Sequence, residues 1–217
     1  MLYCGLNFLF CVVGILCINL LCTESFHTNK CAETERRALL KFKDALIYGN
    51  FLSWKGEDCC RWEGISCNNF TSHVTGLDVK PPYLFFEFGG GKLDSSICEL
   101  KHLIFFTLRY NYLEVKIPKC IGSLGQLIEL NLEGSNFFSV PSSLGNPSNL
   151  QTLDLLGNHN MIANNEWLSH LSSLRYRSLA SLNLSLIFDW LSPISKILSL
   201  SKLELYHCGL HTPKSIL

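Results

Sequence analysis

The feature that most constrains this 217-residue chain is a leucine pattern that returns at a nearly constant spacing. The first clear copy fits L-x-x-L-x-L-x-x-N-x-L and consists of Leu103, Phe106, Leu108, Asn111 and Leu113. Later copies begin at Leu127, Leu150, Leu174 and Leu200, 24, 23, 24 and 26 residues apart, and an earlier copy begins at Val74. Five copies near one period indicate stacked repeats rather than unrelated core strands.

Each copy predicts one short strand, because alternation along L-x-L turns every second side chain inward. A single repeat cannot bury that apolar row, so neighbouring repeats stack and their strands form a parallel sheet. The Asn after the strand suits a buried turn, where its amide can satisfy backbone groups. Ser135 and Cys208 take this position in two copies.

One repeat departs from the pattern, since Arg177 replaces a core leucine and Leu182 replaces the turn Asn. A buried arginine without a partner is costly. We therefore expect this coil to distort, or the arginine side chain to snorkel to solvent.

A second pattern, I-P-x-x-[IL]-G-x-L, lies between the strands. It begins at Ile117-Pro118 and again at Val140-Pro141, and it is typical of plant leucine-rich repeats. Proline ends strand pairing and the following glycine permits a tight turn, so we expect short 3₁₀-like coils on the convex side. Cys98 and Cys120 fall at near-equivalent convex positions, where we expect two buried thiols, with a disulfide as the alternative.

The N-terminus begins with an uncharged apolar stretch over residues 2–22. We interpret it as a secretory signal peptide that ends near residue 25. A retained membrane anchor is the alternative, because about 20 apolar residues can span a bilayer and the basic flank of a signal peptide is missing. Four of the eleven cysteines lie in this stretch and seven follow it. Secretion makes disulfides the default for those seven, and an odd count leaves at least one without a partner in the chain.

Residues 26–73 have the features of a cap for the first exposed repeat. The stretch 34–46 places Leu39, Phe42 and Leu46 on one helical face, and Glu33 and Glu35 at its start suit the helix dipole. The large residues Trp54 and Trp62 follow as candidate packing residues.

The cap also carries a family resemblance. The pattern C-x3-E-R-x-A-L-L-x-F-K from Cys31, then L-S-W ending at Trp54, then C-C-x-W-x-G-x-x-C from Cys59, is similar to plant leucine-rich-repeat receptor-like proteins. It also resembles the polygalacturonase-inhibiting proteins. The stretch 166–176, EWLSHLSSLRY, resembles the large receptor-like proteins of plant immunity.

The resemblance implies an α/β repeat fold. The expected architecture is a right-handed leucine-rich-repeat solenoid with a parallel sheet on its concave face and a helical, disulfide-linked N-terminal cap. It also implies disulfides Cys31–Cys59 and Cys60–Cys67. A zinc site at Cys59, Cys60 and Cys67 is the rival interpretation, which the absence of a C-x2-C pair disfavours.

Three regions follow from these patterns. Residues 1–25 are the expected signal peptide, 26–73 the cap, and 74–217 about five to six repeats without a C-terminal cap. The chain would then be a truncated array.

We find no motif for catalysis, a cofactor or a metal. Lys plus Arg and Asp plus Glu both number 18, so charge gives no argument for nucleic acid. The run Gly89–Lys92 lacks the residues of a phosphate-binding loop. Asn69 and Asn183 each begin an N-x-[ST] glycosylation motif.

A binding surface is expected where strand side chains point away from the core, because such positions mix aromatic and charged residues. The candidates are Phe105, Arg109, Tyr110, Glu129, Asn131, Glu133, Asp154, Arg175, Tyr176, Lys202, Glu204, Tyr206 and His207, with Thr107, Gln151, Thr152 and Ser178 beside them.

We therefore expect a non-enzymatic receptor-like ectodomain at the cell surface or in the apoplast. Its expected partners are an extracellular protein, peptide or glycan ligand and a co-receptor kinase. The resemblance implies a role in pathogen perception. A secreted inhibitor of a microbial wall-degrading hydrolase and a truncated remnant without function are the alternatives. Membrane attachment would come only from an uncleaved leader or a span absent from this sequence.

Overall fold

The computed structural model describes residues 30–46, 51–79, 90–111, 113, 116–158, 167, 170–180, 184–185 and 190–210. The expected signal peptide, Leu182 and Asn183 lie outside this part of the chain.

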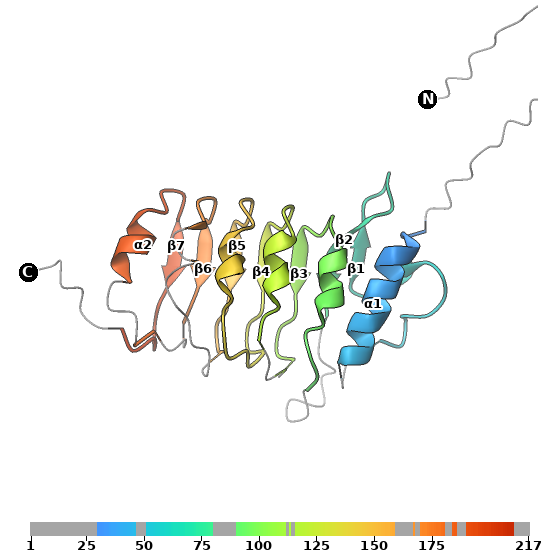
Figure 1. Cartoon of the computed structure of the whole chain (residues 1–217), viewed down its shortest axis with the longest axis horizontal. Coiled ribbons are helices and arrows are strands. Elements are labelled where there is room, and N and C mark those ends of the chain that lie inside the picture. Colours follow the sequence, from blue (N-terminus) through green and yellow to red (C-terminus); the bar gives the residue numbers. More distant parts are fainter. Residues whose placement is uncertain are drawn as a thin grey trace, which may run out of the picture.

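The described residues form one seven-stranded sheet in the order β1 to β7 (Figure 1). Its strands are β1 (Ile65–Cys67), β2 (Val74–Asp78), β3 (Phe105–Thr107), β4 (Glu129–Asn131), β5 (Thr152–Asp154), β6 (Tyr176–Ser178) and β7 (Lys202–Glu204). Strands β2 to β7 are all parallel, as the repeat predicts. Strand β1 pairs with β2 in the antiparallel sense and was not predicted.

The inner row of the sheet is the core of the solenoid. Phe106, Leu130 and Leu153 stand side by side in neighbouring strands and are fully buried. Apolar burial of this kind contributes roughly 25 cal/mol per Å² removed from water. Because each residue is covered only when the next coil is present, the sheet stabilises as a stack.

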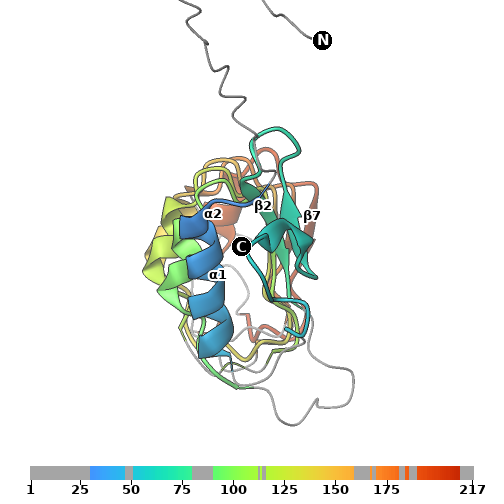
Figure 2. The ribbon, with the colours of Figure 1, turned by 90° about the vertical axis from the view of Figure 1, so that its right-hand side faces the viewer.

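Short 3₁₀ helices cover the opposite side, which confirms the expected convex coils (Figure 2). They are η2 (Ser95–Glu99), η3 (Lys119–Ser123) and η4 (Ser142–Gly145), and the short helix α2 (Leu191–Ser195) lies on this side in the last described coil. A Cβ at Gly122 would lie 2.3 Å from the carbonyl oxygen of Ser143, so only glycine permits this spacing of coils.

The turn positions after β3, β4, β5 and β7 form a buried ladder of contacts with the preceding coils. The amide of Asn111 donates to the carbonyl of Val79 at 3.3 Å, and that of Asn158 donates to Leu132 at 2.9 Å. Ser135 donates to the carbonyl of Leu108, and the Cys208 thiol lies 3.0 Å from the Leu179 carbonyl. The role predicted for this position, satisfying backbone groups of the preceding coil, is confirmed.

The cap helix α1 (Glu33–Ala45) packs its predicted apolar face onto the first coil. Leu39 and Phe42 are fully buried, and the Phe42 ring meets Phe106 edge-on at 6.4 Å between centroids. The rings of Trp54 and Trp62 stack at 5.3 Å. Aromatic packing of this kind explains why the cap carries such large residues.

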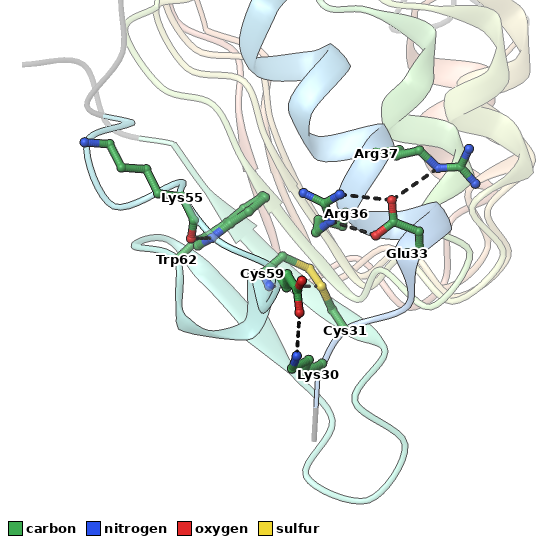
Figure 3. A network of polar contacts seen from close by, with 9 residues as sticks. Lys30, Cys31, Glu33, Arg36, Arg37, Lys55, Cys59 and Trp62 are labelled. Atoms are coloured by element: carbon green, nitrogen blue, oxygen red, sulfur yellow. Dashed lines mark hydrogen bonds and ion pairs between the residues drawn. A yellow bond between two sulfur atoms is a disulfide. The ribbon is translucent and has the colours of Figure 1, made fainter. Parts of the chain in front are cut away.

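Two disulfides link the cap. One joins Cys31, just before α1, to Cys59 in the 3₁₀ helix η1 (Cys59–Arg61), and the other joins Cys60 to Cys67 in β1. Figure 3 shows the first of them among the polar contacts of the cap, where Lys30 pairs with Glu57 and the Trp62 indole donates to the Lys55 carbonyl. The region is thus held by covalent and polar links together.

The expectation of two separate thiols at Cys98 and Cys120 was wrong. The two residues form a third disulfide, with 5.9 Å between their Cα atoms. The reason is the stacking of η2 on η3, which brings residues 22 apart in sequence to adjacent positions. Cys208 retains its thiol and is buried, as expected.

The expectation that the Arg177 side chain snorkels to solvent was wrong, whereas the expected distortion of its coil falls partly outside the described residues. Its side chain neither snorkels nor breaks the strand, because Arg177 keeps register between Leu153 and Leu203 and is fully buried. Its guanidinium lies 5.4 Å from the ring of Trp167, and within the described part of the chain none of its nitrogens has a hydrogen-bond partner. Burial lowers the pKa of this guanidinium to about 9.

Candidate functional site

The parallel strands lie on the side of the solenoid opposite the convex helices (Figure 2). On these strands, two rows of residues flank the buried inner row. Strand register aligns Phe105, Glu129, Thr152, Tyr176 and Lys202 in the first row. The second row contains Thr107, Asn131, Asp154, Ser178 and Glu204. Together with the turn residues Arg109, Tyr110, Glu133, Tyr206 and His207, we call these rows the concave face.

The ring of Tyr110 marks one end of this face. Its hydroxyl donates to the carboxylate of Glu133 in the next coil, and this hydrogen bond raises the Tyr110 pKa to about 12. Tyr110 has a backbone φ of 56°, a left-handed conformation that is uncommon for a bulky residue. The residue remains 39% exposed and is available for contact.

A second polar cluster lies at the other end, on β6 and β7. The ammonium of Lys202 is 2.9 Å from the carboxylate of Glu204 and 5.1 Å from the ring centroid of Tyr176. The hydrogen bond with Lys202 lowers the Glu204 pKa, and that same bond raises the Lys202 pKa. The Tyr176 hydroxyl donates to Glu204 at 3.3 Å. These contacts hold the three side chains in one arrangement.

Asp154 lies between the two clusters. Its carboxylate accepts the backbone N–H of Leu156 at 3.0 Å. Burial raises its pKa, and the nearby carboxylates Glu133 and Glu204 act in the same direction. The centre of the face is therefore acidic, with a tyrosine on each side.

The remaining candidates are distributed along the same surface. Phe105 is 48% and Tyr206 52% exposed, and Arg175 is also exposed beside β6. Ser178 departs from its expected position, because it occupies an outer row but is fully buried. Its short side chain stands between the longer Asp154 and Glu204 of the same row.

Two features of the described residues bear on other chemistry. Ligand atoms of Cys31, Asp58 and Cys60 lie close enough to hold a metal ion, but both sulfurs belong to disulfides. A polar groove also lies between α1 and η2, away from the concave face, and Arg37, Lys41, Asp94 and Glu99 line it.

Sequence reasoning missed a cluster between the cap and the first coil. The buried carboxylate of Glu35 accepts the backbone N–H of Val74 at 3.1 Å and lies 3.2 Å from Nδ1 of His73. The His73 ring stacks on His102 at 4.0 Å. The Glu at the helix start suggested only an interaction with the helix dipole, because the partner residues come from distant parts of the chain.

The comparisons with known proteins agree with this geometry. Residues 32–68 match the family model described as "Leucine rich repeat N-terminal domain". The chain is 39% identical over 197 residues to Receptor-like protein EIX1 of Solanum lycopersicum, a match that covers 83% of this chain and 19% of that protein. It is 30% identical over 228 residues to Receptor-like protein 6 of Arabidopsis thaliana, covering 89% and 22%. These matches relate the chain to the leucine-rich-repeat receptor-like proteins.

The chain spans about a fifth of the length of these two receptor-like relatives. This kinship indicates an extracellular or cell-surface location. In the described ranges, every helix is too short or too polar to cross a bilayer.

Solved structures share the fold. The PEPR1 chain in a complex with AtPEP1 superposes with a TM-score of 0.67 at 23% identity, covering 85% of this chain and 26% of that one. The ectodomain of the receptor kinase SOBIR1 from Arabidopsis thaliana gives 0.60 at 20% identity, covering 82% and 94%. At these identities the likeness establishes the solenoid architecture alone.

Proposed function

We propose that this receptor-like protein binds an extracellular ligand on its concave face. The observation that carries the proposal is the continuity of this surface, in which strand register aligns aromatic and charged residues across five coils. Aromatic residues supply most contact energy in recognition surfaces, and charged neighbours supply specificity.

The ligand class we favour is an extracellular peptide or protein, with a glycan as the alternative. Shape supports a peptide, because a row of short parallel strands offers an elongated surface rather than an enclosed pocket. The acidic centre at Asp154 and Glu133, with Tyr110 and Tyr176 beside it, suits a ligand with a basic group.

Pathogen perception and signalling through a co-receptor kinase form the wider proposal. They rest on kinship with receptor-like proteins and on the shared fold with receptor-kinase ectodomains. The relatives reported above support neither a hydrolase inhibitor nor a remnant without function.

The experiment uses the secreted chain and a panel of apoplastic peptides, secreted microbial proteins and wall oligosaccharides, with binding measured by calorimetry. A concave variant combines Tyr110→Ala, Glu133→Gln and Asp154→Asn. The control combines Lys119→Ala and Ser142→Ala, two exposed changes on the convex helices. We expect the concave variant to weaken a specific ligand at least tenfold and the control to leave it unchanged. Loss of binding in the control alone would contradict the proposal.

A further inference from the structure

The tip of the β1–β2 hairpin is a rigid turn. The carboxamide oxygen of Asn68 accepts the backbone N–H groups of both Phe70 and Thr71 at 2.9 Å. Ser72 completes the turn with a φ of 56°, and the Cys60–Cys67 disulfide holds the base of the hairpin. Figure 1 shows this connection extending past the end of the two strands.

Asn69 lies at this tip with its side chain exposed. Asn68 fixes the turn, and in the described structure no hydrogen bond engages the Asn69 carboxamide. Thr71 is exposed as well, and its hydroxyl oxygen accepts the backbone N–H of His73 at 3.5 Å. Both groups that define an N-x-[ST] acceptor are therefore accessible on a turn that need not unfold.

Phe70 lies between them and is 91% exposed. Covering an exposed aromatic ring with apolar surface is favourable in free energy, because it removes the ring from water. The first N-acetylglucosamine of an N-linked glycan offers such a surface, since one sugar face carries C–H groups and the acetamido group carries a methyl.

We propose that Asn69 carries an N-linked glycan whose first N-acetylglucosamine packs on the Phe70 ring. In the covalent step, a glycosyltransferase of the secretory pathway uses a lipid-diphosphate-linked oligosaccharide. The Nδ2 atom of Asn69 forms a bond to the anomeric carbon, the bond from that carbon to the diphosphate oxygen breaks, and Nδ2 loses one proton. The lipid diphosphate is the leaving group.

The hairpin lies beyond one end of the concave face. β1 is the outermost strand of the sheet, two strand positions from β3, where the concave face begins. Neighbouring strands are about 4.8 Å apart, so the glycan is attached outside the rows of the concave face. Because mapping the glycan requires no ligand, the glycan and the ligand site can be tested independently.

The first experiment maps glycosylation on the native chain secreted from plant cells. Peptide mass spectrometry before and after a peptide:N-glycosidase should show a glycan on the Asn69 peptide and its conversion to aspartate on release. Thr71→Ser should retain the glycan and Thr71→Ala should lose it. An unmodified Asn69 peptide in the secreted native chain overturns the proposal.

The second experiment tests the contact with Phe70. All proteins carry Asn183→Gln, so the glycosidase acts on Asn69 alone, and thermal unfolding is measured before and after digestion. Glycan removal should lower the Tm of the Phe70 protein by about 2 °C and leave the Tm of Phe70→Ala unchanged. Equal shifts in the two proteins, or none in either, would overturn the packing contact. If Asn183→Gln is not secreted, the same comparison is made on the native chain with and without Phe70→Ala.

Discussion

The ring of Tyr110 lies directly over Gly134 of the following coil, so that a Cβ at this glycine would stand 2.5 Å from the ring carbon Cδ1. Gly134 also has a φ of +60°. The two residues therefore determine each other: the glycine permits the ring, and the ring blocks any side chain at the glycine.

Gly134→Ala should destabilise the protein by about 1–3 kcal/mol, through backbone strain and displacement of the tyrosine ring. The control is Gly125→Ala, since no atom lies within 4 Å of that Cβ position. Urea unfolding provides the measurement. In the double variant with Tyr110→Ala, the steric part of the loss should disappear while the φ strain remains. A loss that the double variant leaves unchanged would show that the ring is not the obstacle.

Replacing both Cys98 and Cys120 with serine should cost about 2–4 kcal/mol, because the convex coils lose their cross-link. Cys208→Ser is the matched control. Ser135 already fills the equivalent position in another coil, so a serine hydroxyl at position 208 can donate to the carbonyl that the Cys208 thiol now contacts. Non-reducing peptide mapping and urea unfolding measure the two effects, and free thiols at both Cys98 and Cys120 in the secreted protein would refute the link.

Arg177→Leu should stabilise the protein at neutral pH by about 1–4 kcal/mol, because it replaces a buried guanidinium with the residue found in both neighbouring strands. The exposed Arg175→Leu should change stability by less than about 0.5 kcal/mol.

The same arginine predicts a pH dependence. Burial lowers its pKa from the ordinary arginine value in the unfolded chain to about 9 in the fold, so above pH 9 the unfolded state binds more protons than the folded state. The loss of stability caused by burying the charged guanidinium is therefore complete below pH 9, and it becomes smaller as the pH rises above 9. The difference in unfolding free energy between wild type and Arg177→Leu, measured from pH 8 to pH 10.5, should narrow with pH. A constant difference would refute the lowered pKa.

Asp154→Asn should stabilise the fold by a fraction of a kcal/mol at pH 7, because burial and two neighbouring carboxylates raise the Asp154 pKa. A raised carboxyl pKa means that stability is lost as pH rises through the folded value, so the advantage of the variant should vanish in acid. Denaturant titrations at pH 3 and pH 7 measure the difference in unfolding free energy between Asp154→Asn and the wild type, which should be present at pH 7 and absent at pH 3. If Asp154 contacts ligand, the stabilised variant should bind more weakly.

Periodicity could predict the strands and convex coils because each is determined by residues within one repeat, as at Phe106 and Gly122. It could not predict β1, whose three residues belong to no repeat and form a strand only through pairing with β2. The Cys98–Cys120 link depends on how two coils stack, and the buried state of Ser178 depends on longer neighbours. The concave candidates lie together on one face because alternation is local, whereas the contacts among Tyr176, Lys202 and Glu204 come from distant repeats.

The Glu35 carboxylate reaches from the cap helix to the amide of Val74, and the two residues are 39 apart in sequence. The cap is therefore not an interchangeable module. A chimaera that joins the cap of a relative at residue 68 would inherit a different partner for that amide unless the acceptor carboxylate came with it. Evolutionary exchange of recognition domains among such receptors should accordingly favour crossovers within the repeats, downstream of β2, over crossovers at the boundary between cap and solenoid.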